Sequence, residues 1–176
     1  FQNLEAACLN PDAIEAKNNM LLAAFYGGAA ITASGTTAVH ALSYPLGGKY
    51  HIAHGISNAI MLLPVMRFNR QACLKEFAQV YDMLHSGDGN VKSHKLAGHQ
   101  TASCPITDDQ KADWLLMHME TLIQSLKIPS SLREFGIVQK DLDSLVEGAM
   151  NVQRLLVNNK RTVTPQDARS LYLEVL

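Results

Sequence analysis

Apolar residues recur at helical spacing along most of the chain, and no stretch alternates apolar and polar residues over the length of a strand. Between residues 72 and 84, for example, Leu74, Phe77 and Tyr81 follow one another at intervals of three and four. Residues 20–33 form an almost continuous apolar run, so we expect this part of its helix to be buried. The pattern predicts an all-α protein.

Capping residues and helix breakers predict where the helices begin and end. Asn10, followed by a proline and an aspartate, predicts one start, and Thr107 with Gln110 predicts another. Pro45, with the glycines after it, and Pro64 predict two ends. The predicted helices are 10–34, 38–46, 55–63, 72–84, 107–127, 139–152 and 164–176.

Residues 85–105 are predicted to be a long loop, because they are rich in Gly, Ser, Asn, Lys and His and show no helical period. Three histidines fall in it, and a solvated role is expected for each of them: His85, His94 and His99.

The composition is that of one domain with a sizeable core: 47% of the residues are hydrophobic and 18% are charged. The chain has 15 Lys and Arg against 16 Asp and Glu, and without an excess of basic residues no nucleic acid partner is expected. The longest apolar run is too short for a bilayer span of about 20 residues, so no membrane partner is expected. We see no repeat and no linker, and expect a single all-helical domain over 1–176.

The 3 cysteines include no C-x-x-C pair, which argues against a disulfide framework and against a cysteine zinc site. A reducing, cytoplasmic location is therefore expected. Because the sequence starts at Phe1 without a leader, we expect it to be a piece of a longer protein.

The histidines of the segment 40–54 are the candidate chemistry. On one continuous helix His40 and His54 would be about 21 Å apart, so the chain must fold back for both to reach one ion, and the break predicted at residues 45–48 would allow this. Zinc and ferrous iron both accept neutral imidazole. His51 and His54 could also share an ion. The alternative is that each histidine is a core residue with a satisfied hydrogen bond.

Other sites are not indicated. The chain has no G-x-S-x-G, no G-x-x-x-x-G-K-S/T, no G-x-G-x-x-G and no H-E-x-x-H. Two histidines are also an incomplete catalytic metal site, which usually takes three protein ligands and keeps an open position.

The segment from Val39 to Asn69, VHALSYPLGGKYHIAHGISNAIMLLPVMRFN, resembles the signature of the iron-containing (group III) alcohol dehydrogenases. The resemblance extends over most of the chain and implies the helical C-terminal domain of that family, a helical bundle like that of dehydroquinate synthase. In the family an N-terminal α/β domain binds NAD(P), the helical domain holds a divalent metal, and the active site lies between them. The resemblance therefore implies an enzyme that oxidises an alcohol to an aldehyde or ketone, or runs the reverse.

The resemblance also implies roles for single residues. His40 and His54 match two metal ligands, with Fe²⁺ expected first and Zn²⁺ as the alternative. The other two ligands, in a D-x-x-x-H arrangement, would belong to sequence preceding Phe1. Tyr44 stands where many members have a histidine that is proposed to relay protons. Tyr44 would then either orient the substrate or fill space, and His51 or a chain of waters would take over the relay.

The expected partners are a small alcohol or aldehyde, the missing N-terminal nucleotide-binding domain, and further copies of the chain in a homo-oligomer, since apolar surface would be left uncovered. The choice between NAD and NADP stays open. One alternative is a non-catalytic helical module, or a truncated fragment with no activity of its own. A metal-dependent hydrolase is a third hypothesis, for which no spacing supplies the further ligands.

Overall fold

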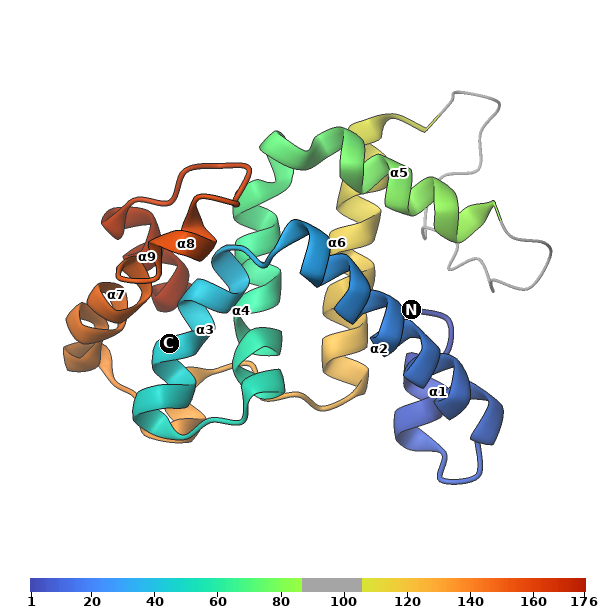
Figure 1. Ribbon diagram of the computed structural model, residues 1–176, viewed down its shortest axis with the longest axis horizontal. Coiled ribbons are helices and arrows are strands. Elements are labelled where there is room, and N and C mark those ends of the chain that lie inside the picture. Colours follow the sequence, from blue (N-terminus) through green and yellow to red (C-terminus); the bar gives the residue numbers. More distant parts are fainter. Residues whose placement is uncertain (87–105) are drawn as a thin grey trace.

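The computed structural model describes residues 1–86 and 106–176, and every regular element in these two stretches is helical (Figure 1). The all-α prediction is confirmed. None of these helices is long and apolar enough to cross a membrane. The α-helices are α1 Leu4–Leu9, α2 Ile14–Ser34, α3 Ala38–Tyr50, α4 His54–Asn69, α5 Leu74–His85, α6 Asp108–Ser125, α7 Leu142–Met150, α8 Gln153–Leu156 and α9 Pro165–Glu174. The 3-10 helices are η1 Arg70–Cys73, η2 Leu132–Phe135 and η3 Gln139–Asp141.

Two predicted helix starts are confirmed by capping boxes. At α6 the Thr107 hydroxyl oxygen accepts from the backbone N–H of Gln110, whose side-chain oxygen accepts from the N–H of Thr107 at 2.9 Å. Thr164 and Asp167 form the same pair of bonds at α9. These boxes satisfy donors that a helix start otherwise leaves without a partner.

The start of α2 differs from its prediction. The side-chain oxygen of Asn10 accepts from the N–H of Asp12 at 2.9 Å, which closes a turn, and α2 begins only at Ile14. The short helix α1 precedes that turn and packs on α2. The predicted end at Ser34 is confirmed, and Gly35 follows with a positive φ of 71°.

Pro45 and Pro64 do not end their helices. Both lie inside, in α3 and α4 respectively, so the predicted ends were wrong. A proline costs about 3 kcal/mol in a helix interior, and tertiary packing outweighs this cost. Pro64 is buried, and the ring of Pro45 packs against Gly148 of α7 so closely that a methyl group on Gly148 would lie 2.9 Å from the Pro45 Cγ.

Helix α4 lies between two groups of buried side chains. One group joins it to α3, α7, α8 and α9, with Leu42 and Leu46 fully buried. The other joins it to α5 and α6 around Phe77 and Leu115. Figure 1 shows α4 in the middle of the molecule, with α7, α8 and α9 on one side and α5 and α6 on the other. The position of α4 is therefore fixed from both sides.

Tyr172 connects α9 to α3. Its side chain is 0% exposed, and its O–H donates to the backbone oxygen of Leu42 at 2.6 Å. Burial raises the pKa of the Tyr172 phenol. A buried phenol needs such a partner, because an unsatisfied polar group in the core is costly.

The second half of α2 is exposed, so the prediction that it is buried was wrong. Leu21 is 71% exposed and Phe25 is 69% exposed, and Leu22 and Tyr26 are exposed beside them. The apolar sequence favours burial, but burial also needs a covering surface, and the described residues provide none.

Replacing Gly148 by Ala should destabilise the chain by about 1–3 kcal/mol, because the added methyl group would overlap the ring of Pro45. This loss should exceed the gain of about 1 kcal/mol that alanine brings within a helix. The free energy of unfolding from denaturant titration measures the difference.

Gly28→Ala is the matched control, because Gly28 is also helical and nothing lies within 4 Å of an added methyl group. It should stabilise the chain by about 0.5–1 kcal/mol. A Gly148→Ala variant as stable as Gly28→Ala would show that Pro45 does not constrain α7.

Candidate metal centre

His40 and His54 each stand at the beginning of a helix. His40 lies in the first turn of α3, and His54 is the first residue of α4. The helices lie side by side (Figure 1), and the chain reverses between them at residues 51–53. The reversal predicted at residues 45–48 is therefore wrong in position, because α3 continues through Pro45 to Tyr50.

The rings of His40, Tyr44 and His54 form a triangle. The ring centres of His40 and His54 are 5.3 Å apart, those of Tyr44 and His54 are 6.2 Å apart, and those of His40 and Tyr44 are 6.4 Å apart. Tyr44 reaches this position because it lies one helical turn after His40. The helix pair thus brings together three of the four residues that the sequence singled out.

The spacing of the two imidazoles fits a shared divalent ion. A nitrogen ligand lies about 2.1 Å from zinc or a similar ion, which puts the ring centre roughly 3.3 Å from it. Two such rings at a tetrahedral angle have centres about 5.4 Å apart, close to the 5.3 Å between the ring centres of His40 and His54. The described residues contain no group of three or more His, Cys, Asp or Glu side chains that could complete a site.

Burial lowers the pKa of His40, and the positive charge that His54 can carry lowers it further. A lowered pKa favours the neutral imidazole at neutral pH. Because only a neutral ring has a lone pair for a metal ion, the environment of His40 favours the form that can act as a ligand.

Two residues that sequence analysis missed connect His54 to α3. The side-chain nitrogen of Asn58 lies 2.9 Å from Nε2 of His54, and the hydroxyl oxygen of Ser43 lies 2.5 Å from the side-chain oxygen of Asn58. Ser43 is buried. The one signal in the sequence was spacing, since Asn58 follows His54 by four residues and shares its helix face.

His51 lies apart from the triangle of rings. It is exposed and caps the C-terminus of α3 in the left-handed conformation, with a φ of 55°. Its backbone N–H donates to the carbonyl oxygen of Gly47 at 3.1 Å. In the described part of the chain its ring has no contact with those of His40, Tyr44 or His54.

His85 belongs to a second aromatic cluster. It is the last residue of α5 and not part of a loop, so that prediction was wrong: its ring stacks on Tyr81, with ring centres 3.9 Å apart. In the same cluster His118 stacks on Trp114 at 4.8 Å. Residues 87–105 of the predicted loop lie outside the described residues, among them His94, His99 and Cys104.

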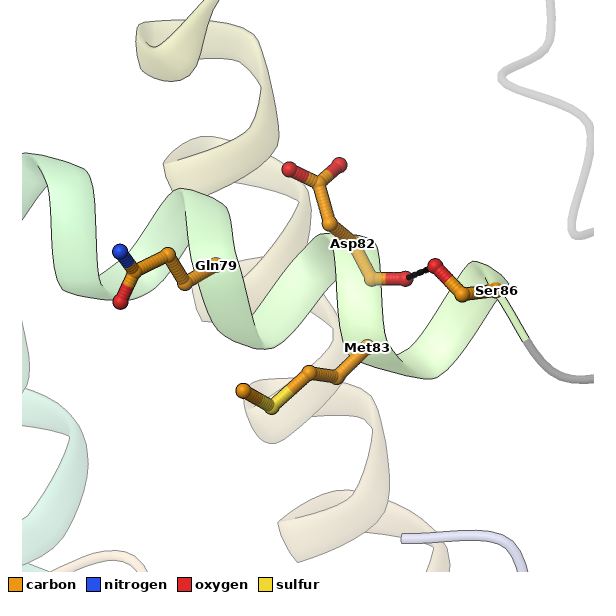
Figure 2. A pocket seen from close by; sticks show the side chains of 4 residues that line it. All are labelled: Gln79, Asp82, Met83 and Ser86. Carbon is orange, nitrogen blue, oxygen red and sulfur yellow. Dashed lines mark hydrogen bonds between the residues drawn. The ribbon is translucent and has the colours of Figure 1, made fainter.

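A hollow of about 740 Å³ lies along α5, lined by Gln79, Asp82, Met83 and Ser86 (Figure 2). The hydroxyl of Ser86 donates to the backbone oxygen of Asp82 at 2.5 Å. The carboxylate of Asp82 is paired with Lys111 at 2.7 Å. Asp82 and Ser86 are thus engaged with their own surroundings, and none of the four lining residues comes from α3 or α4.

Comparison with known proteins connects these observations to one family. The family model described as "Fe-containing alcohol dehydrogenase family, C-terminal" matches residues 1–176. The chain is 32% identical over 171 residues to long-chain-alcohol dehydrogenase 1 of Geobacillus thermodenitrificans (strain NG80-2), which covers 97% of this chain and 40% of that protein. It is 29% identical over 163 residues to 4-hydroxybutyrate dehydrogenase of Clostridium kluyveri, covering 90% and 38%. The chain thus spans about two fifths of these relatives.

Solved structures share the fold. A crystal structure of 1,3-propanediol oxidoreductase superimposes with a TM-score of 0.83 at 23% identity, covering 99% of this chain and 42% of that one. The alcohol dehydrogenase from Oenococcus oeni gives a TM-score of 0.81 at 22% identity. At these identities the likeness concerns the arrangement of the helices.

Replacing His51 by Gly should stabilise the chain by about 1 kcal/mol, because glycine adopts the left-handed C-cap conformation without a steric penalty. The free energy of unfolding measures the gain. Lys127→Gly is the matched control, since Lys127 also has a positive φ, of 53°, and follows α6 away from the two histidines. If only Lys127→Gly stabilises, the His51 side chain makes a compensating contribution of its own.

Proposed function

The chain belongs to the Fe-containing alcohol dehydrogenase family as its C-terminal part, and from this membership we propose that it supplies the metal-holding side of a dehydrogenase active site. The reaction proposed for the whole protein is the NAD(P)-dependent oxidation of a small alcohol to an aldehyde or ketone, or its reverse. The observation that carries the proposal is the pair of imidazoles from α3 and α4, with ring centres 5.3 Å apart.

His40 and His54 are proposed to hold a divalent ion, Fe²⁺ first and Zn²⁺ as the alternative, since imidazole suits both. Such an ion, when bound, polarises the alcohol or carbonyl oxygen as a Lewis acid. The lowered pKa of His40 supports this assignment, because it favours the neutral ring.

Tyr44 is proposed to orient the substrate. Its phenol can both donate and accept a hydrogen bond, and its ring centre lies 6.4 Å from that of His40 and 6.2 Å from that of His54. A neutral phenol is a weaker proton acceptor than a neutral imidazole. We therefore assign the relay of the substrate proton to His51 or to a chain of waters.

The rest of the enzyme is proposed to come from outside this chain. A nucleotide-binding domain would hold NAD(P), and further ligands would complete the ion's coordination, because a catalytic metal usually takes three protein ligands. The exposed apolar face of α2 supports contact with such a domain or with another copy of the chain. We propose a cytoplasmic location, which fits the two described cysteines, both free thiols.

Metal binding by the 176-residue chain tests the proposal. The chain should bind about one Fe²⁺, Co²⁺ or Zn²⁺, and His40→Ala and His54→Ala should each weaken binding by about tenfold or more, because each removes a ligand. Equilibrium dialysis with metal analysis measures both stoichiometry and affinity.

His118→Phe is the control, since it removes a histidine elsewhere and keeps a ring against Trp114. It should bind metal like the wild type. If neither the wild-type chain nor the full-length protein binds metal, the proposal fails, and the remaining interpretation is a helical module without metal chemistry.

Tyr44→Phe in the full-length enzyme should lower turnover by about tenfold, the effect of losing one hydrogen bond to the substrate. Steady-state kinetics over a range of pH measure it. The variant keeps the ring and its volume, so unchanged turnover and an unchanged pH profile would mean that Tyr44 only fills space.

A further inference from the structure

A chain of two hydrogen bonds runs from the buried side of α3 to the ring of His54. Ser43 lies one turn after His40 and is 1% exposed. Its hydroxyl oxygen is 2.5 Å from the side-chain oxygen of Asn58, and the side-chain nitrogen of Asn58 is 2.9 Å from Nε2 of His54. Asn58 is therefore held at both ends, by α3 and by the ring.

The direction of both hydrogen bonds depends on which oxygen receives the proton of the Ser43 hydroxyl. A hydroxyl has one proton to donate, and two oxygens lie within reach: that of the Asn58 side chain at 2.5 Å and the backbone oxygen of His40 at 3.0 Å. The backbone oxygen of His40 lies inside α3, where it already faces a backbone donor one turn on. The shorter contact is to Asn58, so we assign the proton to that bond.

This assignment fixes the tautomer of His54. An amide nitrogen only donates, so Nε2 of His54 must accept, and the single ring proton must be on Nδ1. The hydrogen bond of one ring nitrogen thus decides the state of the other. If Ser43 instead donated to His40, its oxygen would accept from the amide of Asn58, the amide would turn over, and Nε2 of His54 would carry the proton.

We propose that Asn58, oriented by Ser43, is a positioning residue that keeps His54 in the Nδ1–H tautomer, in which the lone pair of Nε2 accepts the hydrogen bond of the Asn58 amide. The inference rests on the proposed function, because an ion beside His40 would take this lone pair in place of the Asn58 amide. A ring already in this tautomer binds a cation without first giving up the proton of Nε2.

Nitrogen-15 NMR of the metal-free 176-residue chain tests the proposal, since protonated and unprotonated ring nitrogens differ widely in chemical shift. At about pH 8.5 histidines are neutral. The wild type should show Nδ1–H for His54, and Asn58→Asp should show Nε2–H, because a carboxylate only accepts. One hydrogen bond of ordinary strength sets the tautomer ratio at about tenfold, so the two spectra should be clearly opposite.

Ser43→Ala and Ser57→Ala complete the set. Ser43→Ala frees the amide to turn, so both tautomers should appear. Ser57 is equally buried and precedes Asn58, but its hydroxyl bonds to the backbone oxygens of Ile52 and Ala53, so Ser57→Ala should keep the wild-type tautomer. Ser43→Ala also keeps the test decisive if Asn58→Asp does not fold.

Three results would overturn the proposal: Nε2–H in the wild type, Nδ1–H retained in Asn58→Asp, or a Ser43→Ala spectrum equal to that of Ser57→Ala. Zinc titration of the wild type, followed by the same spectra, separates this proposal from the proposed function. Zinc should shift Nε2 of His54 while Nδ1 keeps its proton. A failure to bind zinc contradicts the metal site alone, because the tautomer is read before any metal is added.

Discussion

The packing of α3 against α4 is the contact on which the rest of the molecule depends. Both histidines of the candidate metal centre are at the starts of these two helices, so their rings meet only if the helices keep one relative position. Close packing supplies this constraint, since Leu42 and Leu46 are fully buried. A shift of one helix by a few ångströms would separate the imidazoles beyond the reach of a shared ion.

The remaining helices hold this pair in place through contacts that depend on shape and on single hydrogen bonds. Helix α7 approaches α3 closely because Gly148 leaves room for the ring of Pro45. Helix α9 is tied to α3 by the hydroxyl of Tyr172, and α5 and α6 support α4 from its other side. The two helices that hold the histidines are therefore packed against neighbours on both sides, which suits a site with little tolerance in distance.

Burial and polar neighbours within this packing influence the protonation of His40 and His54. Partial burial lowers the pKa of His40, and the hydrogen bonds from Ser43 through Asn58 reach His54. A buried hydroxyl must find a partner, and here the partner lies on the neighbouring helix, so the requirement also orients a side chain beside His54. The apolar face of α2, by contrast, has no such local partner among the described residues.

Local sequence determined the helical class, the capped starts at Thr107 and Thr164, and the histidine pair within a family signature, because these signals act over a few residues. Tertiary structure decided what depends on distant segments. Pro45 stays inside a helix because α7 packs on it, and the apolar half of α2 is exposed because nothing described covers it. Asn58 reaches His54 with its amide turned by a serine on another helix. Propensities and periods contain no information on such contacts, which exist only once the helices have packed.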